Sequence, residues 1–435
     1  MTSLHHHLLR QLEPWRQAPG WVVALSGGLD SSVLLHGLAS LAKAHNLPPL
    51  RAVHVAHGLQ NAAAAWPGHC AQLCRELQVP YQALPVKVEA GPSVEQAARE
   101  ARYQALAAQL APGEVLLTGQ HRDDQAETLL LRLLRGAGVR GAAAMAKARP
   151  LGQGALARPL LDLNREALLA YAQAVGLTWV DDPSNADLTF DRNYLRHEVI
   201  PRLRQRWPGA VANLARSAGH FAEGLALLEE LARQDLRLAE QGAPLPWLGL
   251  PSLALAPLRD LSQARQRNAL QAWLATRSRL PDTAHWAGWE ALRDAGQAAT
   301  PIWRLADGAL CRAQDRAWWL SGPWLARPPA PACWTDLATP LALPGNGELR
   351  WVGQIPEGQV EVRYRQGGES VLIPGRGRRD LKRLLNEAGL PAFVRARLPL
   401  LWLKGELVAV ANLHGAGKRL GELRWRPPTN DRCLR

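Results

Sequence analysis

The sequence predicts an α/β protein whose N-terminal domain is a doubly wound parallel sheet, followed by a helical middle domain and a small α+β C-terminal domain. In the first 200 residues, short apolar runs alternate with amphipathic stretches of helical length. Parallel strands need such helical connections, and these helices cover both faces of the sheet. A chain of 435 residues is also too long for one core, which indicates two or three domains.

The elements of the N-terminal domain follow from apolar runs, their lengths and the glycines that end them. The first run, Trp21–Leu25, is short and ends at a glycine pair, as a buried strand does. Val33, Leu34, Leu38 and Leu41 then recur at helical spacing. The same reasoning predicts strands over 50–55, 81–88 and 114–118, and helices over 31–44, 64–77, 93–110 and 123–134.

The pattern changes beyond residue 215. Helical stretches over 220–241, 261–276 and 286–296 follow, and ten of the 17 tryptophans lie between Trp247 and Trp351. We expect most of these indoles to lie in the core. A proline-rich linker (327–331) precedes strands over 361–365, 400–403 and 407–410 and a helix over 381–388. The predicted domains are 1–215, 216–326 and 345–435.

Composition narrows the class of protein. The formal net charge is +13, of which residues 350–435 hold +9, from 17 Lys+Arg and 8 Asp+Glu. Such a surplus favours a polyanion, usually RNA or DNA, although a solvated basic face is the alternative. The sequence has no apolar run of membrane length, no signal-peptide pattern and only five scattered cysteines. We therefore predict a cytoplasmic protein with no membrane partner and no disulfide framework.

The most informative string lies between the first strand and the first helix, and reads Ser26-Gly27-Gly28-Leu29-Asp30-Ser31-Ser32. Glycines allow close approach of the backbone to a ligand, and a helix N-terminus with hydroxyls favours an anion. A glycine-rich turn with a serine cap is the alternative. The chain has neither Gly-Lys-Ser/Thr nor Gly-x-Gly-x-x-Gly, and the string resembles the pyrophosphate loop (PP-loop) of ATP-pyrophosphatases.

Two further clusters carry charged side chains. Asp123, Asp124 and Glu127 follow the fourth strand and share one helix face, where they can hold Mg²⁺ or a cationic substrate. An acidic first helical turn is the alternative. The second cluster comprises Asp182, Asn185, Arg192, Asn193 and Arg196, and Arg99 and Arg102 form a similar string. Their arginines suit a phosphate or adenylate; the alternative is exposed polar turns and helices.

Together these strings resemble the bacterial tRNA(Ile)-lysidine synthetases over nearly the whole chain. The segments that carry the resemblance are Ser26–Ser32, His54–Leu59, Ala98–Tyr103, Gln120–Thr128, Asp182–Arg196 and Lys382–Leu403. The sequence departs from the family at Ala56, where we expect histidine or asparagine between His54 and His57.

The resemblance implies an activity. Family members use ATP and Mg²⁺ to join L-lysine to the wobble cytidine of the CAU anticodon of tRNA(Ile), through an adenylated cytidine, releasing pyrophosphate and AMP. The implied nucleotide-binding residues are Ser26, Gly27, Gly28, Leu29, Asp30, Ser31 and Ser32, with Asp30 also holding Mg²⁺. The implied catalytic residues are Asp30, Asp124, Glu127, Arg102 and Arg196, with Arg99 as a further candidate. The implied substrate-binding residues are His121, Asp123, Asp124, Glu127, Asp182, Asn185, Arg192 and Asn193, with His121 as a candidate base.

The resemblance also implies how tRNA is held. The middle domain is a candidate for tRNA recognition, and a homodimer is one of the oligomeric states left open. The basic residues expected to follow the tRNA backbone are Arg376, Arg378, Arg379, Lys382, Arg383, Lys418, Arg419, Arg424 and Arg426.

Three other classes of protein compete with this reading. An asparagine-synthetase-like amidoligase needs a cysteine directly after Met1, where Thr2 stands. A tRNA thiolation enzyme uses paired cysteines, whereas Cys70 and Cys74 are four residues apart and no Cys-x-x-Cys occurs. A non-catalytic RNA-binding protein explains the charge but not the PP-loop together with the carboxylates.

Overall fold

The computed structural model describes residues 2–56, 65–86, 94–296, 299–328, 330–413, 415 and 421–430. The chain divides into two compact units, Met1–Leu227 and Leu228–Arg435, and the division falls within the long helix α10 (Ala210–Ala239). Each unit has its own buried apolar clusters. Among the helices that the structure describes, none is both long and apolar enough to cross a membrane.

The N-terminal unit contains a six-stranded sheet in the order β3-β2-β1-β4-β6-β5. Neighbouring strands are parallel except for the last pair, β6 and β5, which are antiparallel. The predicted parallel sheet is therefore confirmed, and the hairpin at its edge was not predicted. The strands are β1 (Trp21–Ala24), β2 (Leu50–Ala56), β3 (Tyr81–Pro85), β4 (Val115–Leu117), β5 (Ala148–Leu151) and β6 (Gly154–Ala157).

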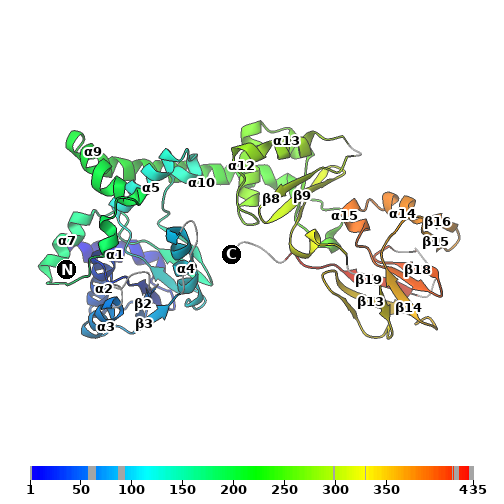
Figure 1. Ribbon diagram of the computed structural model, residues 1–435, viewed down its shortest axis with the longest axis horizontal. Helices are drawn as coiled ribbons and strands as arrows, with labels where there is room; N and C mark the ends of the chain where they lie inside the picture. The colour runs from blue at the N-terminus through cyan, green and yellow to red at the C-terminus, as the bar shows by residue number, and fades with distance from the viewer. Residues whose placement is uncertain are drawn as a thin grey trace. The chain divides into compact units, whose positions relative to one another are not determined.

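Helices cover both faces of this sheet, because the strand side chains alternate between two apolar clusters. Trp21 and Val23 of β1 pack with α1, α2, α3 and α7, whereas Val22 packs with α4 on the other face. Figure 1 shows α2 and α3 on one side of β2 and β3 and α4 on the other. The helices are α1 (Ser3–Leu12), α2 (Leu29–Ala42), α3 (Trp66–Glu76), α4 (Val94–Ala108), α5 (Arg122–Leu134), α6 (Val139–Ala142), α7 (Arg165–Ala174), α8 (Asp191–Tyr194) and α9 (Ile200–Arg206).

The strand order places a ligand crevice between β1 and β4. From β1 the chain builds outward through β2 to β3, then returns to place β4 on the other side of β1. Connections that leave in opposite directions open a crevice at the carboxyl ends of such strands, where ligands bind in doubly wound sheets. The loop after β1 and the segment after β4 are therefore adjacent, although about 90 residues separate them in the sequence.

The middle part of the chain differs from the helical domain that the sequence predicts. It has the expected helices α12 and α13, but also a four-stranded antiparallel sheet in the order β7-β10-β9-β8. Its strands are rich in tryptophan, and Trp303, Trp318 and Trp319 are buried, as expected of core indoles. The signal that could have revealed it is Ala306-Asp307-Gly308, in which Ala306 and Asp307 form the turn between β8 and β9 and Gly308 begins β9. The elements are α11 (Ala256–Arg259), α12 (Gln263–Leu274), α13 (Ala287–Asp294), β7 (Ser252–Ala254), β8 (Ile302–Leu305), β9 (Gly308–Ala313) and β10 (Arg316–Leu320).

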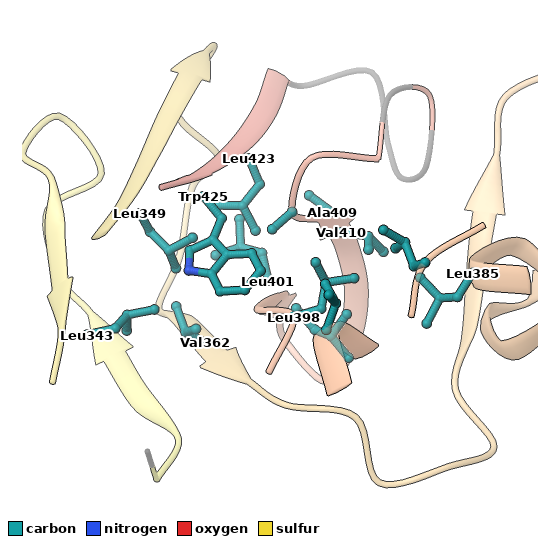
Figure 2. Close-up of a cluster of buried hydrophobic side chains, with 14 of the residues drawn as sticks. Leu343, Leu349, Val362, Leu385, Leu398, Leu401, Ala409, Val410, Leu423 and Trp425 are labelled. Carbon is teal, nitrogen blue, oxygen red and sulfur yellow. The ribbon is translucent and has the colours of Figure 1, made fainter. Parts of the chain in front are cut away.

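The C-terminal part is an α+β arrangement of small sheets, as predicted. Leucine and valine side chains from several strands surround the indole of Trp425, which Figure 2 shows at the centre of the cluster. The Trp425 indole nitrogen donates to the carbonyl of Asn346 at 2.7 Å, so its polar atom is satisfied. The elements are β11 (Ala332–Trp334), β12 (Leu341–Leu343), β13 (Gly347–Gly353), β14 (Val360–Arg363), β15 (Ser370–Ile373), β16 (Gly377–Asp380), α14 (Leu381–Glu387), α15 (Ala392–Arg395), β17 (Leu400–Leu403), β18 (Glu406–Val410) and β19 (Gly421–Arg426).

Candidate active site

The loop after β1 is held open by its own hydroxyl groups. Gly27 has φ +88°, a conformation that favours glycine, and the Ser31 hydroxyl donates to the carbonyl of Gly28 at 3.1 Å. The Ser26 hydroxyl lies 3.0 Å from that of Ser31 and accepts from the Gly28 amide. The buried Ser32 hydroxyl has no hydrogen-bond partner among the residues that the structure describes. The loop therefore begins α2 with polar groups suited to phosphate oxygens.

The segment after β4 approaches this loop closely. A Cβ on Gly119 would lie 2.9 Å from the carbonyl carbon of Asp30, so only glycine fits at this position. Gly119 is not among the predicted site residues, although a glycine directly after a predicted strand is the appropriate signal. Asp30 in turn has one buried carboxylate oxygen, Oδ1, that finds no hydrogen-bond partner in the described part of the chain. An unpaired buried carboxylate oxygen at a phosphate loop suits a cation.

His121 is buried among three carboxylates. Its Nε2 lies 3.6 Å from Asp30 Oδ2 and 3.5 Å from Asp124 Oδ2, and its Nδ1 lies 3.6 Å from Asp123 Oδ2. Burial lowers the pKa of His121, but the surrounding carboxylates outweigh it and raise the pKa to about 10. The raised pKa favours the protonated imidazolium, which pairs with these carboxylates, and this argues against the expected role of His121 as a base.

Asp124 and Glu127 of α5 are both engaged by arginines of the following cluster. Glu127 Oε2 accepts from Arg192 Nε at 2.8 Å, and its Oε1 accepts from Arg196 Nε at 2.6 Å. Asp124 Oδ1 accepts from Arg192 at 2.8 Å and from Arg196 at 3.1 Å. Burial raises the pKa of Asp124, but His121 and the arginines outweigh it and hold the pKa below its usual value. Two carboxylates and two guanidiniums thus form one largely buried network.

The two carboxylates differ in access. Asp124 lines a cavity of about 800 Å³, whereas the Glu127 side chain is 1% exposed and does not line it. Asp124 can therefore contact a ligand in the cavity, and Glu127 acts through Arg192 and Arg196.

The predicted residues Asp182 and Asn193 shape the segment before α8. Asp182 Oδ1 accepts from the amide and the hydroxyl of Ser184, each at 2.8 Å. The Asn193 side chain donates to the carbonyls of Ser184 and Asp187, each at 2.8 Å. These bonds satisfy the turn itself, so both residues position the cavity wall that they also line.

The cavity brings most of the predicted residues together. Its walls come from the PP-loop, β2, α4, the segment after β4 and the segment 180–196. The predicted residues that line it are Ser26, Gly28, Leu29, Asp30, Ser31, Arg99, Arg102, Asp124, Asp182, Asn185, Arg192, Asn193 and Arg196. The predicted residues that do not line it are Gly27, Ser32, His121, Asp123 and Glu127.

The strand-end loop after β2 is described only in part. His54 is buried, and its Nδ1 lies 2.9 Å from the carbonyl of Leu25, while Ala56 lines the cavity. His57, Gly58 and Leu59 lie outside the described residues. His54 therefore braces the end of β1 and, like Ala56, lines the cavity.

The thiols near the loop do not form a redox site. Cys70 and Cys74 are buried, and burial raises their pKa values to about 12 and about 11. Such thiols stay protonated and unreactive at neutral pH. Within the described ranges, no group of three or more His, Cys, Asp or Glu side chains is arranged to hold a metal ion.

The basic residues predicted to follow tRNA lie on the surface of the second unit. Arg376, Arg378 and Arg379 belong to the exposed β15–β16 segment, and Lys382 and Arg383 to α14. Arg424 and Arg426 are exposed on β19, whereas Lys418 and Arg419 lie outside the described residues. Several of these arginines also form surface ion pairs, such as Arg378 with Glu406 at 3.1 Å.

Comparisons with known proteins find similar domains along this chain. Residues 1–203 match the model of a PP-loop domain, residues 253–318 that of a TilS substrate binding domain, and residues 360–423 that of a TilS substrate C-terminal domain. The solved structure of a U34-tRNA thiolase from Methanococcus maripaludis covers 51% of this chain and 78% of its own, with 18% identity and a TM-score of 0.42.

Full-length relatives show the family. The tRNA(Ile)-lysidine synthase of Pseudomonas putida is 60% identical over 97% of this chain and 99% of its own. That of Pseudomonas aeruginosa is 58% identical, covering 99% and 98%, and that of Coxiella burnetii is 38% identical, covering 93% and 91%. Because these identities extend over both units, the chain belongs to the tRNA(Ile)-lysidine synthase family.

Proposed function

We propose that this protein joins L-lysine to the wobble cytidine of a tRNA(Ile) with a CAU anticodon, using ATP and releasing pyrophosphate and AMP. The proposal rests on one observation. The PP-loop, Asp124, Arg192 and Arg196 all line the same cavity. It joins a phosphate site to a charged substrate site, and a volume of about 800 Å³ is within the range of small-molecule and cofactor sites.

The first step is adenylation of the base. The cytosine 2-carbonyl oxygen attacks the α-phosphate, its bond to phosphorus forms, and the bond between the α-phosphate and pyrophosphate breaks. The serine hydroxyls and amides of Ser26–Ser32 hold the leaving pyrophosphate at the start of α2. Arg102 lines the same cavity and is placed to offset negative charge that develops on the phosphate.

Asp30 is the residue that would hold Mg²⁺. Its buried Oδ1 lacks a partner in the described structure, and its carboxylate borders the PP-loop, so the residues fit a hard cation that also binds phosphate oxygens. The ion supplies charge neutralisation for the phosphates when it is bound.

The second step transfers lysine. Its ε-amine, once deprotonated, attacks C2 of the adenylated cytosine, the bond from C2 to oxygen breaks, and AMP leaves. Asp124 faces the cavity and is ionised, so it is placed to bind the lysine ammonium before reaction. Glu127 holds Arg192 and Arg196 in position, which assigns it a positioning role.

The tRNA must present an unstacked base. An anticodon loop is single-stranded, so moving one base into a cavity costs less than it does in a duplex. The exposed arginines of β15–β16 and β19 supply positive charge for the tRNA backbone. A cytoplasmic location and a homodimer remain predictions from the sequence, and sedimentation of the purified protein tests the second.

The test is incubation of the purified protein with ATP, Mg²⁺, labelled lysine and tRNA(Ile) transcripts. We expect label in the transcript with cytidine at the wobble position and none when uridine replaces it. Another PP-loop adenylating enzyme, such as a thiolase or an amidoligase, would form AMP without attaching lysine to RNA. That outcome would refute the proposal.

A further inference from the structure

Four arginines surround one phenol ring beside the cavity. The guanidinium carbons of Arg99, Arg149 and Arg102 lie 5.2, 5.5 and 6.0 Å from the centroid of the Tyr103 ring. Arg158, which is 6% exposed, adds a fourth positive charge next to the phenol. We call Arg99, Arg102, Tyr103, Arg149 and Arg158 the Tyr103 cluster.

The residues of the Tyr103 cluster come from separate elements of the N-terminal unit. Arg99, Arg102 and Tyr103 lie on α4, which covers one face, whereas Arg149 lies on the edge strand β5 and Arg158 directly follows β6. Because β6 is parallel to β4, Arg158 lies at the same carboxyl edge as the PP-loop. The cluster therefore extends from the cavity wall towards the outer edge of the sheet.

The described residues place no counter-charge beside this cluster. No carboxylate in the part of the chain that the structure describes forms an ion pair with any of its four arginines. Arg149 donates to the adjacent carbonyl of Pro150, at 3.2 Å. Arg158 is more than nine-tenths buried and donates through a terminal nitrogen to the carbonyl of Ala146 at 2.6 Å, but its Nε has no hydrogen-bond partner among the described residues. Four guanidiniums without a described counter-charge, one of them with an orphaned donor, suit an anion.

The electrostatics of Tyr103 agree with an excess of positive charge. Burial raises the pKa of this phenol, but the charges of Arg99, Arg158 and Arg102 outweigh burial and hold the pKa below its usual value. The arginines also repel one another, since Arg149 and Arg99 lower the pKa of Arg158 in addition to the effect of its burial. A bound anion would relieve this repulsion.

We propose that the Tyr103 cluster binds a backbone phosphate of the RNA strand next to the nucleotide that enters the cavity. This inference rests on the proposed function and names the RNA contact nearest to the reacting base. The PP-loop already provides hydroxyls and amides for the nucleotide phosphates, whereas Arg149 and Arg158 do not line the cavity and so lie outside it. An RNA strand that inserts one base into the cavity would pass the Tyr103 cluster, and its phosphodiesters match the planar guanidinium groups of the arginines.

The test compares two exposed arginines of the same unit. Arg149→Ala removes a charge from the Tyr103 cluster, and Arg75→Ala removes one from α3, which packs on the opposite face of the sheet. Neither side chain is buried, so neither substitution removes part of the core. Binding of the full-length protein to an anticodon stem-loop of tRNA(Ile) is measured over a range of salt concentrations. We expect Arg149→Ala to weaken binding roughly three- to tenfold and to reduce the salt slope by about 1, and Arg75→Ala to change neither.

A chemical change in the RNA identifies the phosphate that Arg149 contacts. Each linkage of the anticodon loop is replaced in turn by an uncharged methylphosphonate. One linkage should weaken binding to the wild-type protein and to Arg75→Ala but cost nothing further in Arg149→Ala, because that variant has already lost the contact. If Arg149→Ala instead raises the KM for ATP and leaves RNA binding unchanged, the cluster serves the nucleotide and the inference is wrong. Equal effects of the two alanine variants on RNA binding would also overturn it.

Failure of this inference is separable from failure of the proposed function. If the wild-type protein attaches lysine to the transcript while Arg149→Ala behaves like Arg75→Ala, only the Tyr103 cluster assignment falls. If the wild-type protein neither binds the stem-loop nor transfers lysine, the proposed function itself is wrong.

Discussion

Replacing Glu127 by glutamine tests the buried network between α5 and α8. The change keeps the shape of the side chain but removes one negative charge that faces Arg192 and Arg196. It leaves two guanidiniums with the single carboxylate of Asp124, so one positive charge loses its partner in a largely buried site. Breaking a buried ion pair from one side typically costs 3–5 kcal/mol.

The exposure of the arginines decides where in that range the cost falls. Their side chains are 28% and 30% exposed, so water partly solvates the charge left behind. Glutamine also keeps one acceptor oxygen. We therefore expect Glu127→Gln to lower the free energy of unfolding of the N-terminal unit by about 3 kcal/mol. The double variant with Arg196→Gln should recover part of this loss, because it removes the uncompensated charge.

The assay is urea unfolding followed by hydrogen exchange of the α5 amides, which reports the unit that holds the network. Glu223→Gln on α10 is the matched control, because its side chain is 81% exposed and its contact with His220 is 3.7 Å. The control should change stability by less than about 0.5 kcal/mol. If Glu127→Gln costs no more than this control, the network does not exist in solution as described.

Three further predictions concern Gly119, the cation expected at Asp30 and the ion pair between Arg51 and Glu114. Gly119→Ala should lower kcat/KM for ATP at least about tenfold, because its Cβ would meet the Asp30 backbone at 2.9 Å; steady-state kinetics check this, and wild-type kinetics would contradict it. Asp30→Asn should raise the Mg²⁺ concentration needed for half-maximal turnover about tenfold, and an unchanged Mg²⁺ titration would remove the metal assignment. Burial raises the pKa of Glu114, but Arg51, 2.7 Å away, outweighs it and holds the pKa below 4.5. The contribution of ionised Glu114 to the free energy of unfolding is therefore present above pH 4.5 and is lost as the pH falls below that value. Glu114→Gln should cost about 1–2 kcal/mol at pH 7 and progressively less in acid, as urea unfolding at several pH values would show.

Local patterns predict the part of the fold that local interactions determine. The strand, loop and helix over residues 21–42 follow from an apolar run, a glycine pair and helical spacing, and the structure confirms them. The β5–β6 hairpin was missed because Arg149, Pro150 and several small residues lack the branched or aromatic side chains that mark strands. The hairpin joins the sheet because β6 pairs with β4, and the local sequence does not reveal this pairing.

In the candidate site, too, local features could be predicted and long-range contacts could not. The PP-loop is contiguous, so its residues and their chemistry could be predicted together. The pairing of Glu127 with Arg196 joins residues 69 positions apart, and nothing in either string indicates that each neutralises the other. The sequence therefore predicted which side chains carry charge, but not that the carboxylates expected to face a substrate are held by arginines.

The turn that carries Arg196 is wider than an α-helix. Leu195–Val199 is π-helical, between α8 and α9, and a π-helical turn contains one more residue than the α-helical turn it replaces. The extra residue is accommodated by the wider turn, so the helices on either side keep nearly the phase of an uninterrupted α-helix. Deleting one residue there would therefore leave Ile200 buried against Ala126 of α5 and Arg192 in position, but would reshape the turn that carries Arg196. The wide turn thus sets where Arg196 points, and we expect such a deletion to displace Arg196 from Glu127 while the flanking helices keep their packing.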